Sequence, residues 1–204
     1  MTKDDKREAI IQAASKQFSQ YGYRKTAMDD ISKRMGISRA SLYSYFDNKD
    51  EIFRNVSLSI HERALSRAQE HLVGGSSGAE SSGAESIPSL QVRVGNALLA
   101  RHSPFQKAVA ESLHGDELFD EYSRLCGDIV HDSHARFQAL LASALNAASG
   151  SGDIDLKKAG ITGKAAAEIL NLGAAGLKRG APDLAIFRKR IKNFTKAFIV
   201  GLGG

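Results

Sequence analysis

The sequence predicts an all-α protein, and three observations support this fold class. The 204 residues include only 3 Pro and no Trp, and they lack the alternating runs of Val, Ile and Thr that are typical of strands. Apolar residues recur instead at intervals of three and four, as on one face of a helix. Gly, Pro and capping residues separate these periodic stretches into individual helices. The chain is long enough for one helical body with a small appended domain.

Cysteine content and hydropathy exclude several classes of protein. Cys126 is the single cysteine, so neither an internal disulfide nor a four-cysteine zinc site can form. The longest apolar runs are much shorter than a membrane span, and no signal peptide opens the chain. We therefore expect a soluble, cytoplasmic protein with no membrane partner.

The net charge is +5, but the excess does not lie where a DNA-binding segment is expected. Residues 1–71 contain 13 Lys and Arg against 10 Asp and Glu, whereas residues 157–196 contain ten against two. This balance is compatible with a polyanionic partner and does not by itself identify one.

The first predicted helix spans residues 3–21 and ends at Gly22. Ile10, Ala14 and Phe18 recur on one of its faces. We expect this face to cover the back of the two short helices that follow.

Residues 26–46 have the pattern of a helix-turn-helix. Thr26 is suited to cap a short helix, with Asp29 three residues later, and Gly36 can adopt the left-handed conformation that ends it. Ser38 is suited to cap a second helix, Arg39–Phe46. Two short helices joined by a Gly-containing turn of three or four residues define this motif.

The apolar positions agree with that motif. Ile31 and Met35 share a face of the first helix, and Leu42 and Phe46 share a face of the second, with Ile37 in the turn. Packing these faces together leaves small, hydroxylated or cationic side chains pointing outward. These are Arg39, Ala40, Ser41, Tyr43 and Ser44. Such a surface fits the major groove of DNA.

A longer helix follows, from about Lys49 to Leu72. Asn48 is suited to cap it, and Glu51 stands at the capping-box spacing. Lys49 falls in the first turn, where backbone N–H groups favour an anion, so a phosphate there can meet both the ammonium and these donors.

These residues resemble the DNA-binding signature of the TetR family of bacterial regulators. The matching positions are Thr26, Ile31, Gly36-Ile37-Ser38, Leu42-Tyr43, Tyr45-Phe46 and Asn48-Lys49, within residues 6–53. The resemblance implies an N-terminal three-helix DNA-binding domain, residues 1–53, and a helical ligand-binding and dimerisation domain, residues 54–204, joined by a linker helix. Beyond residue 53 only the all-helical layout agrees with the family.

The resemblance also implies how double-stranded operator DNA is held. Lys49 is expected to clamp a phosphate, with Thr26, Tyr43 and Tyr45 also contacting the DNA backbone. The alternative for Tyr45 is a half-buried packing aromatic. Arg39 is the expected base reader because its fork matches guanine O6 and N7, and Ala40 and Ser41 are expected to lie closer in the groove.

The rest of the chain is expected to form a loop followed by five helices. Residues 74–86 contain the pentapeptide Ser-Ser-Gly-Ala-Glu twice in tandem, which cannot bury an apolar face. The expected helices span 87–101, 104–114, 116–148, 163–179 and 182–202. Pro104 and Thr162 are suited to their starts, and Gly180 to an end.

The last two helices are candidates for a homodimer interface, as the resemblance implies. The last helix carries a stripe of bulky side chains, and the helix before it carries small residues that allow close approach of another helix. These residues are Ile169, Gly173, Gly176, Phe187, Ile191, Phe194 and Phe198. The alternative is that both stripes face the core of a single chain. The cations Arg188, Lys189, Arg190 and Lys192 are then either a solvated side of the helix or a second DNA contact.

Motifs of catalysis and cofactor binding are missing from the sequence, so we expect neither an enzyme nor a bound cofactor. His131 and His134, with Cys126 and Asp132 nearby, do not obviously converge on a metal. A pocket for a small-molecule effector can be lined by His102, Tyr122, Cys126, Ser133 and Asn171. The resemblance therefore implies a ligand-responsive transcriptional regulator, most often a repressor in this family. The alternative is a DNA-binding structural factor of the same fold without an inducer.

Overall fold

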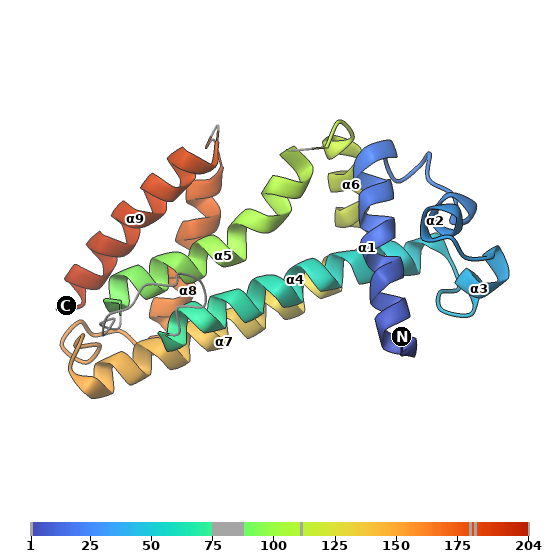
Figure 1. Ribbon diagram of the computed structural model, residues 1–204. Coiled ribbons are helices and arrows are strands. Elements are labelled where there is room, and N and C mark those ends of the chain that lie inside the picture. The colour runs from blue at the N-terminus through green and yellow to red at the C-terminus, as the bar shows by residue number, and fades with distance from the viewer. Residues whose placement is uncertain (1, 75–87, 111, 180, 182, 204) are drawn as a thin grey trace, which may run out of the picture. The chain divides into compact units, whose positions relative to one another are not determined.

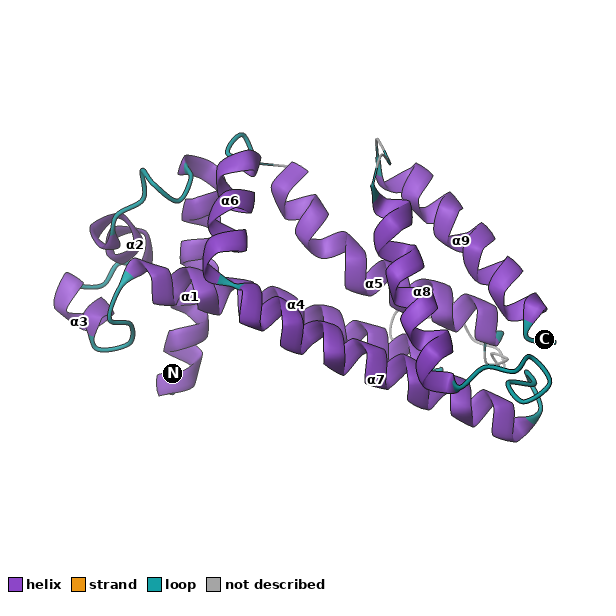
Figure 2. Ribbon diagram, turned by 180° about the vertical axis from the view of Figure 1, so that it is seen from behind, coloured by secondary structure: helices purple, strands orange, loops and turns teal. Residues whose placement is uncertain are grey.

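The computed structural model describes residues 2–74, 88–110, 112–179, 181 and 183–203. Within these ranges every regular element is a helix, which confirms the all-α prediction (Figures 1 and 2). The helices are α1 (Lys3–Tyr21), α2 (Met28–Met35), α3 (Arg39–Tyr43), α4 (Lys49–Val73), α5 (Leu90–Ala110), α6 (Gly115–Leu125), α7 (Gly127–Ser151), α8 (Gly163–Lys178) and α9 (Leu184–Gly201). The predicted loop, apart from Gly74, lies outside the described residues.

The chain packs as two compact units. The N-terminal unit combines Met1–Glu62 with Pro104–His131, and the C-terminal unit combines Arg63–Ser103 with Asp132–Gly204. α4, α5 and α7 therefore each contribute residues to both units. That the DNA-binding domain ends at residue 53 remains a prediction.

The core of the N-terminal unit is built around the two short helices. Ile10 and Phe18 of α1 pack with Ile31 of α2 and Leu42 of α3, and these four side chains are almost fully buried. α6 packs beside α1 in this unit (Figure 1). Burying four such side chains stabilises the unit by roughly 6–12 kcal/mol before chain entropy is subtracted.

The C-terminal unit has a separate core, to which α4, α5, α7, α8 and α9 each contribute. Phe137 and Leu141 of α7, Leu170 of α8, and Phe187 and Ile191 of α9 are fully buried there. α8 and α9 lie side by side (Figures 1 and 2).

The predicted helix 116–148 is wrong, because the chain breaks at Cys126. This residue has φ −124° and ψ 15°, outside the helical region, and Gly127 follows it. The apolar stripe of the sequence is accordingly divided. Cys126 packs in the core of the N-terminal unit, whereas Phe137 and Leu145 pack in the core of the C-terminal unit.

The two predicted helices 87–101 and 104–114 are also wrong, since α5 continues through Pro104. Proline inside a helix removes one backbone hydrogen-bond donor and costs about 3 kcal/mol. For this reason the sequence predicted that one helix ends before Pro104 and another begins there. The helix nevertheless extends to Ala110. The predicted start at Thr162 is confirmed, since its side chain accepts from Ala165 N. Asp183 caps the last helix in the same way and accepts from Ile186 N. Gly180 and Pro182 lie outside the described residues.

Candidate nucleic-acid interface

α3 places its polar side chains in solvent and its apolar side chains in the core. Ser38 caps it as predicted, accepting a hydrogen bond from Ser41 N at 3.1 Å. The helix is shorter than predicted and ends at Tyr43, while Phe46 is buried just beyond it. Arg39, Ala40, Tyr43 and Ser44 are exposed and Ser41 is half-buried. The predicted outward surface is therefore the one that this short helix presents.

The turn before α3 depends on Gly36. This residue ends α2 in the left-handed conformation, with φ 67° and ψ 30°, as predicted from the sequence. Its N–H donates to Lys33 O, and Ile37 N donates to Ser32 O. These bonds turn the chain within two residues and bring Ser38 to the start of α3.

Arg39 is held over its neighbour one turn away. Its Nη2 lies 3.4 Å from the Tyr43 hydroxyl, and its guanidinium carbon lies 5.5 Å from the centre of the Tyr43 ring. This contact restricts the long side chain without burying it, so the fork of donors stays available to a base edge.

Tyr45 lies apart from the exposed surface of α3. It is half-buried and packs against the core of the N-terminal unit. This placement agrees with the packing alternative, and its contact with a phosphate stays a prediction.

Thr26 is not the cap of α2, which corrects the sequence-based expectation. Ala27 occupies the cap position, and Asp30 accepts from Ala27 N at 2.8 Å. The Thr26 side chain is buried, and its hydroxyl donates to Gly22 O at 2.6 Å. A side chain so placed reinforces the loop between α1 and α2, and it does not offer its hydroxyl to a phosphate.

Lys49 stands in the first turn of α4, as predicted, but its ammonium is directed at the protein. Nζ donates to Tyr23 O at 2.8 Å and to Thr26 O at 2.9 Å, and it lies 4.2 Å from the centre of the Tyr23 ring. Burial lowers the pKa of Lys49. In this arrangement Lys49 braces the α1–α2 loop, so the phosphate-clamp role is not the one that the structure presents.

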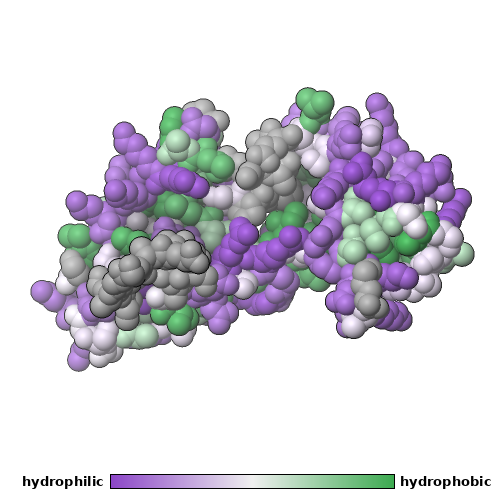
Figure 3. Space-filling model, viewed as in Figure 1, coloured by the Kyte–Doolittle hydropathy of each residue, from purple (hydrophilic) through white to green (hydrophobic). Residues whose placement is uncertain are grey.

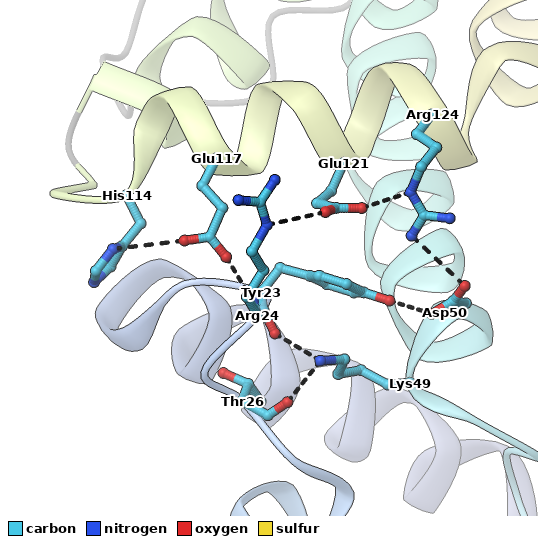
Figure 4. Close-up of polar contacts among 9 residues, drawn as sticks. All are labelled: Tyr23, Arg24, Thr26, Lys49, Asp50, His114, Glu117, Glu121 and Arg124. Carbon is cyan, nitrogen blue, oxygen red and sulfur yellow. Dashed lines mark hydrogen bonds and ion pairs between the residues drawn. The ribbon is translucent and has the colours of Figure 1, made fainter.

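A polar network surrounds this brace (Figure 4). The Tyr23 hydroxyl donates to Asp50, and burial, followed by this hydrogen bond, raises the Tyr23 pKa. Arg124 of α6 lies 3.8 Å from Asp50 and donates to Glu121 at 2.8 Å. Glu121 in turn lies 3.5 Å from Arg24. The network therefore ties α6 to the loop and to the start of α4.

Glu117 completes the attachment of α6. Its carboxylate accepts from Arg24 N at 2.5 Å and lies 3.9 Å from His114 Nδ1. The sequence analysis missed this role, although Glu117, Glu121 and Arg124 stand at the i, i+4, i+7 spacing of one helix face. That spacing was a usable signal, but the partners are about 70 to 90 residues away in the sequence.

The predicted pocket residues are divided between the two units. In the C-terminal unit, His102 Nε2 lies 3.1 Å from Asn171 Oδ1, and the His102 ring meets the Phe137 ring edge-on at 6.3 Å. Burial lowers the His102 pKa to about 3, so the imidazole is neutral at pH 7. Ser133 is also buried in this unit, one turn before Phe137.

Tyr122 and Cys126 belong instead to the N-terminal unit. The Tyr122 hydroxyl lies 2.7 Å from His61 Nε2, and the two rings stack. Burial raises the pKa of the Cys126 thiol. These two residues are explained by packing within their own unit.

The prediction that Phe187 and Ile191 lie in a dimer interface is wrong, because both side chains are fully buried in the core of the C-terminal unit. Phe194 is half-buried against Gly173, where an added Cβ would lie 2.4 Å from the end of its ring. This close approach requires glycine or a shift of the ring. Phe198 is half-buried too.

A different set of apolar side chains on α8 and α9 reaches solvent. Ile169 is 45 % exposed, and Gly176 is exposed on the same face of α8. The sequence analysis did not identify the other exposed members: Leu172 (55 %), Ile186 (37 %) and Val200 (56 %).

Two further tests apply to the described part of the chain only. It contains no group of three or more His, Cys, Asp or Glu placed to hold a metal ion. None of its helices is both long enough and apolar enough to cross a membrane.

Comparison with known proteins identifies the N-terminal segment. Residues 10–56 match the family model described as "Bacterial regulatory proteins, tetR family". Over 48 residues the chain is 50 % identical to the biofilm operon icaADBC HTH-type negative transcriptional regulator IcaR of Staphylococcus epidermidis, covering 24 % of this chain and 26 % of IcaR. Over 69 residues it is 33 % identical to the probable acrEF/envCD operon repressor of Escherichia coli, covering 34 % and 31 %. The chain thus spans about a third or less of these relatives.

Solved structures extend the likeness of fold to nearly the whole chain. A TetR-family regulator from Rhodococcus sp. superposes with a TM-score of 0.64 at 20 % identity, covering 96 % of this chain and 99 % of that one. SmeT, the repressor of the Stenotrophomonas maltophilia multidrug efflux pump SmeDEF, superposes with a TM-score of 0.61 at 19 % identity, covering 94 % and 88 %. At these identities the likeness concerns the fold alone.

Proposed function

Since this chain belongs to the TetR family of bacterial transcriptional regulators, we propose that it is an operator-binding repressor that acts as a homodimer and is released by a small molecule. The observation that carries DNA binding is the exposed side of α3. Arg39, Ala40, Tyr43 and Ser44 point into solvent while Leu42 anchors the helix below them. A helix so anchored can enter a major groove about 12 Å wide.

Each residue of α3 has a distinct task in this proposal. Arg39 reads a guanine through its two parallel donors, and the Tyr43 ring restricts the positions of the exposed guanidinium. Ala40 and Ser41 allow close approach to the base edges. Lys49 and Thr26 act indirectly, because they hold the α1–α2 loop and the start of α4 in place.

Repression is supported by two relatives whose names describe them as a negative regulator and an operon repressor. A repressor of this kind prevents transcription while it occupies its operator.

A homodimer is supported by the exposed apolar face of α8 and α9. Ile169, Leu172 and Gly176 recur at the i, i+3, i+7 spacing of one helix face, and Ile186 and Val200 are exposed on α9. A single recognition helix contacts too few bases for high specificity, whereas two copies can meet successive major grooves about 34–36 Å apart.

Release by a small molecule is supported by polar groups that the C-terminal unit buries. Asn171 is 1 % exposed, and its Nδ2 has no hydrogen-bond partner among the described residues. The Ser133 hydroxyl, 2 % exposed, is in the same situation. Unpaired buried donors are costly, and a ligand offering acceptors would satisfy them.

The test of DNA recognition begins by selecting bound fragments from a genomic library, which supplies the operator. Arg39→Ala is expected to weaken operator binding by about 1–3 kcal/mol and to relax base preference at one position, because a bidentate pair of hydrogen bonds to one base is removed. Lys16→Ala, an exposed cation on α1, is the matched control for loss of charge. Fluorescence anisotropy measures both variants. Equal losses on operator and random duplex for Arg39→Ala would remove its role as a base reader.

A further inference from the structure

The positive charge of one helix, α9, equals the net charge of the entire protein. α9 contains five cations, Arg188, Lys189, Arg190, Lys192 and Lys196, and no Asp or Glu. The chain as a whole has a net charge of +5, so the remaining residues balance to zero. In Figure 3, hydrophilic side chains follow the course of α9 at the upper left.

Four of these cations form a stripe along one side of α9. Arg188, Lys192 and Lys196 follow one another at intervals of four residues, so they lie nearly in line over about 12 Å of helix. Lys189 lies beside them. All four are exposed, and none forms an ion pair with any residue in the described ranges. We call these four residues the α9 stripe.

The DNA-reading unit has the opposite balance. Its segments, Met1–Glu62 and Pro104–His131, hold 13 Lys and Arg against 15 Asp and Glu. Several of its cations are also neutralised by partners. Lys33 pairs with Asp29 at 2.6 Å, and Arg54 with Asp128 at 2.6 Å. This unit therefore offers little general attraction for DNA, whose non-specific binding depends on unpaired Lys and Arg.

We propose that the α9 stripe is a second DNA-binding surface, which holds phosphates without reading sequence. Its cations stand in a row on a rigid helix and have no carboxylates to compete with DNA, so each can replace a counterion on the phosphate backbone. The stripe supplies the sequence-independent affinity, and α3 supplies the choice of site.

A DNA phosphate backbone fits this surface better than a membrane does. A helix that lies on a membrane needs large apolar side chains beside its cations. Phe187, Ile191 and Ile199 of α9 are buried in the core, and its exposed large apolar side chains, Ile186 (37 %) and Val200 (56 %), stand near its two ends. Between those two residues the stripe presents four exposed cations and no exposed large apolar side chain, which suits phosphates on the outside of a duplex.

The stripe also lies away from the contact of α9 with α8. Phe194 marks the side of α9 that meets α8, since it contacts Gly173. Lys192 and Lys196 stand about 160° and 200° around the helix from Phe194. Changes to the stripe therefore test DNA binding without touching the α8 contact.

The experiment measures binding of the full chain to a duplex of arbitrary sequence at several salt concentrations. The variant Arg188→Gln, Lys192→Gln, Lys196→Gln removes three charges from the stripe. The slope of log K against log[salt] is expected to fall by about 0.9 for each phosphate that the variant no longer neutralises, so by about 3 for each copy of α9 on the DNA. The control variant Arg67→Gln, Lys158→Gln, Lys164→Gln removes three exposed charges scattered over α4, the loop before α8 and α8, and is expected to keep nearly the original slope.

Each outcome decides the proposal. An unchanged slope for the stripe variant overturns it, and so does an equal fall for the control, which would indicate net charge alone. Binding to phosphatidylglycerol vesicles that is abolished in the stripe variant, with DNA binding intact, would assign the surface to a membrane. Arg39→Ala is expected to change the slope on arbitrary DNA by no more than about 0.9, the value for a single phosphate, which separates this surface from α3. Circular dichroism during heating confirms that every variant is folded.

Discussion

At the scale of single residues, Lys49 illustrates how the same position can serve two purposes. The sequence places a cation in the first turn of a helix, where backbone N–H groups attract anions. The carbonyl groups of Tyr23 and Thr26 lie within reach of that side chain and accept both of its hydrogen bonds. A residue expected to hold DNA thus holds the loop beneath the recognition helix.

Lys49→Met is accordingly expected to lower the free energy of unfolding by about 1.5–3 kcal/mol, because two hydrogen bonds from a charged group are removed. Urea unfolding followed by circular dichroism measures the change. Lys25→Met, an exposed lysine of the same loop, is the control and is expected to change stability by less than about 0.5 kcal/mol. A phosphate clamp predicts the reverse pattern for Lys49→Met: unchanged stability and a flatter salt dependence of DNA binding.

The pair formed by Arg54 and Asp128 makes stability depend on pH. The Arg54 hydrogen bonds lower the Asp128 pKa from 3.8 to about 2. Since the folded state favours the ionised carboxylate, this contribution is complete above about pH 4 and is lost as the pH falls from about 4 to 2.

Asp128→Asn should therefore be less stable than the original protein at pH 7, and the difference should shrink as the pH falls through that window. Chemical unfolding at pH 7, 4 and 2.5 tests this. Asp120 is an exposed carboxylate on α6, and Asp120→Asn is the control. Its unfolding free energy is expected to differ less from that of the original protein and to change less with pH. A difference in unfolding free energy between Asp128→Asn and the original protein that stays constant from pH 7 to 2.5 would contradict the role of the ion pair.

At the scale of elements, the turn between α2 and α3 is where local sequence decides the geometry most completely. Gly36 alone adopts the left-handed conformation there, and Ser38 caps the next helix two residues later. Both features follow from short-range chemistry, so the sequence predicted them correctly.

Gly36→Ala is expected to destabilise the protein by about 1–2 kcal/mol, because a Cβ strains the left-handed backbone although the surrounding space is open. Gly36→Asn should cost less, since asparagine tolerates this conformation. Gly127→Ala is the matched control: its φ is ordinary and its space is also open, so it should be neutral or slightly stabilising. Differential scanning calorimetry ranks the three variants. Equal melting temperatures for Gly36→Ala and Gly127→Ala would contradict the role of the turn.

Errors in the predicted helices arose where distant packing overruled local preference. Cys126 continues an apolar stripe in the sequence, yet it ends a helix because its neighbours on that stripe belong to two different cores. Pro104 indicates a helix start locally, but α5 passes through it. Neither outcome is encoded within a few residues. The network on Glu117 was missed for the same reason, because its partner Arg24 lies 93 residues away.

At the scale of the whole molecule, the corrected predictions mainly concern how two chains assemble. Phe187 and Ile191 were predicted to face a second chain, and both are buried in their own core. Their stripe has the same spacing as an interface stripe, so the pattern could not distinguish one from the other. On α8, the large apolar side chains that remain exposed for pairing are Ile169 and Leu172.

The variant Ile169→Glu, Leu172→Glu should therefore shift a dimer toward monomer, since like charges would face each other across the interface. Sedimentation velocity over a range of protein concentrations measures the change. Val92→Glu, with a 45 % exposed side chain on α5, is the control and should leave the assembly unaltered. A double variant that dimerises as tightly as the original protein would show that the two chains meet elsewhere.

The concentration of charge on α9 also affects how molecules of this protein behave toward one another in solution. Without the five cations of that helix, 23 basic and 23 acidic side chains would remain. Such a chain would be close to isoelectric at neutral pH, where mutual repulsion vanishes and precipitation is favoured. The helix that we expect to bind phosphates is thus also the part of the protein that keeps it soluble through charge repulsion between molecules.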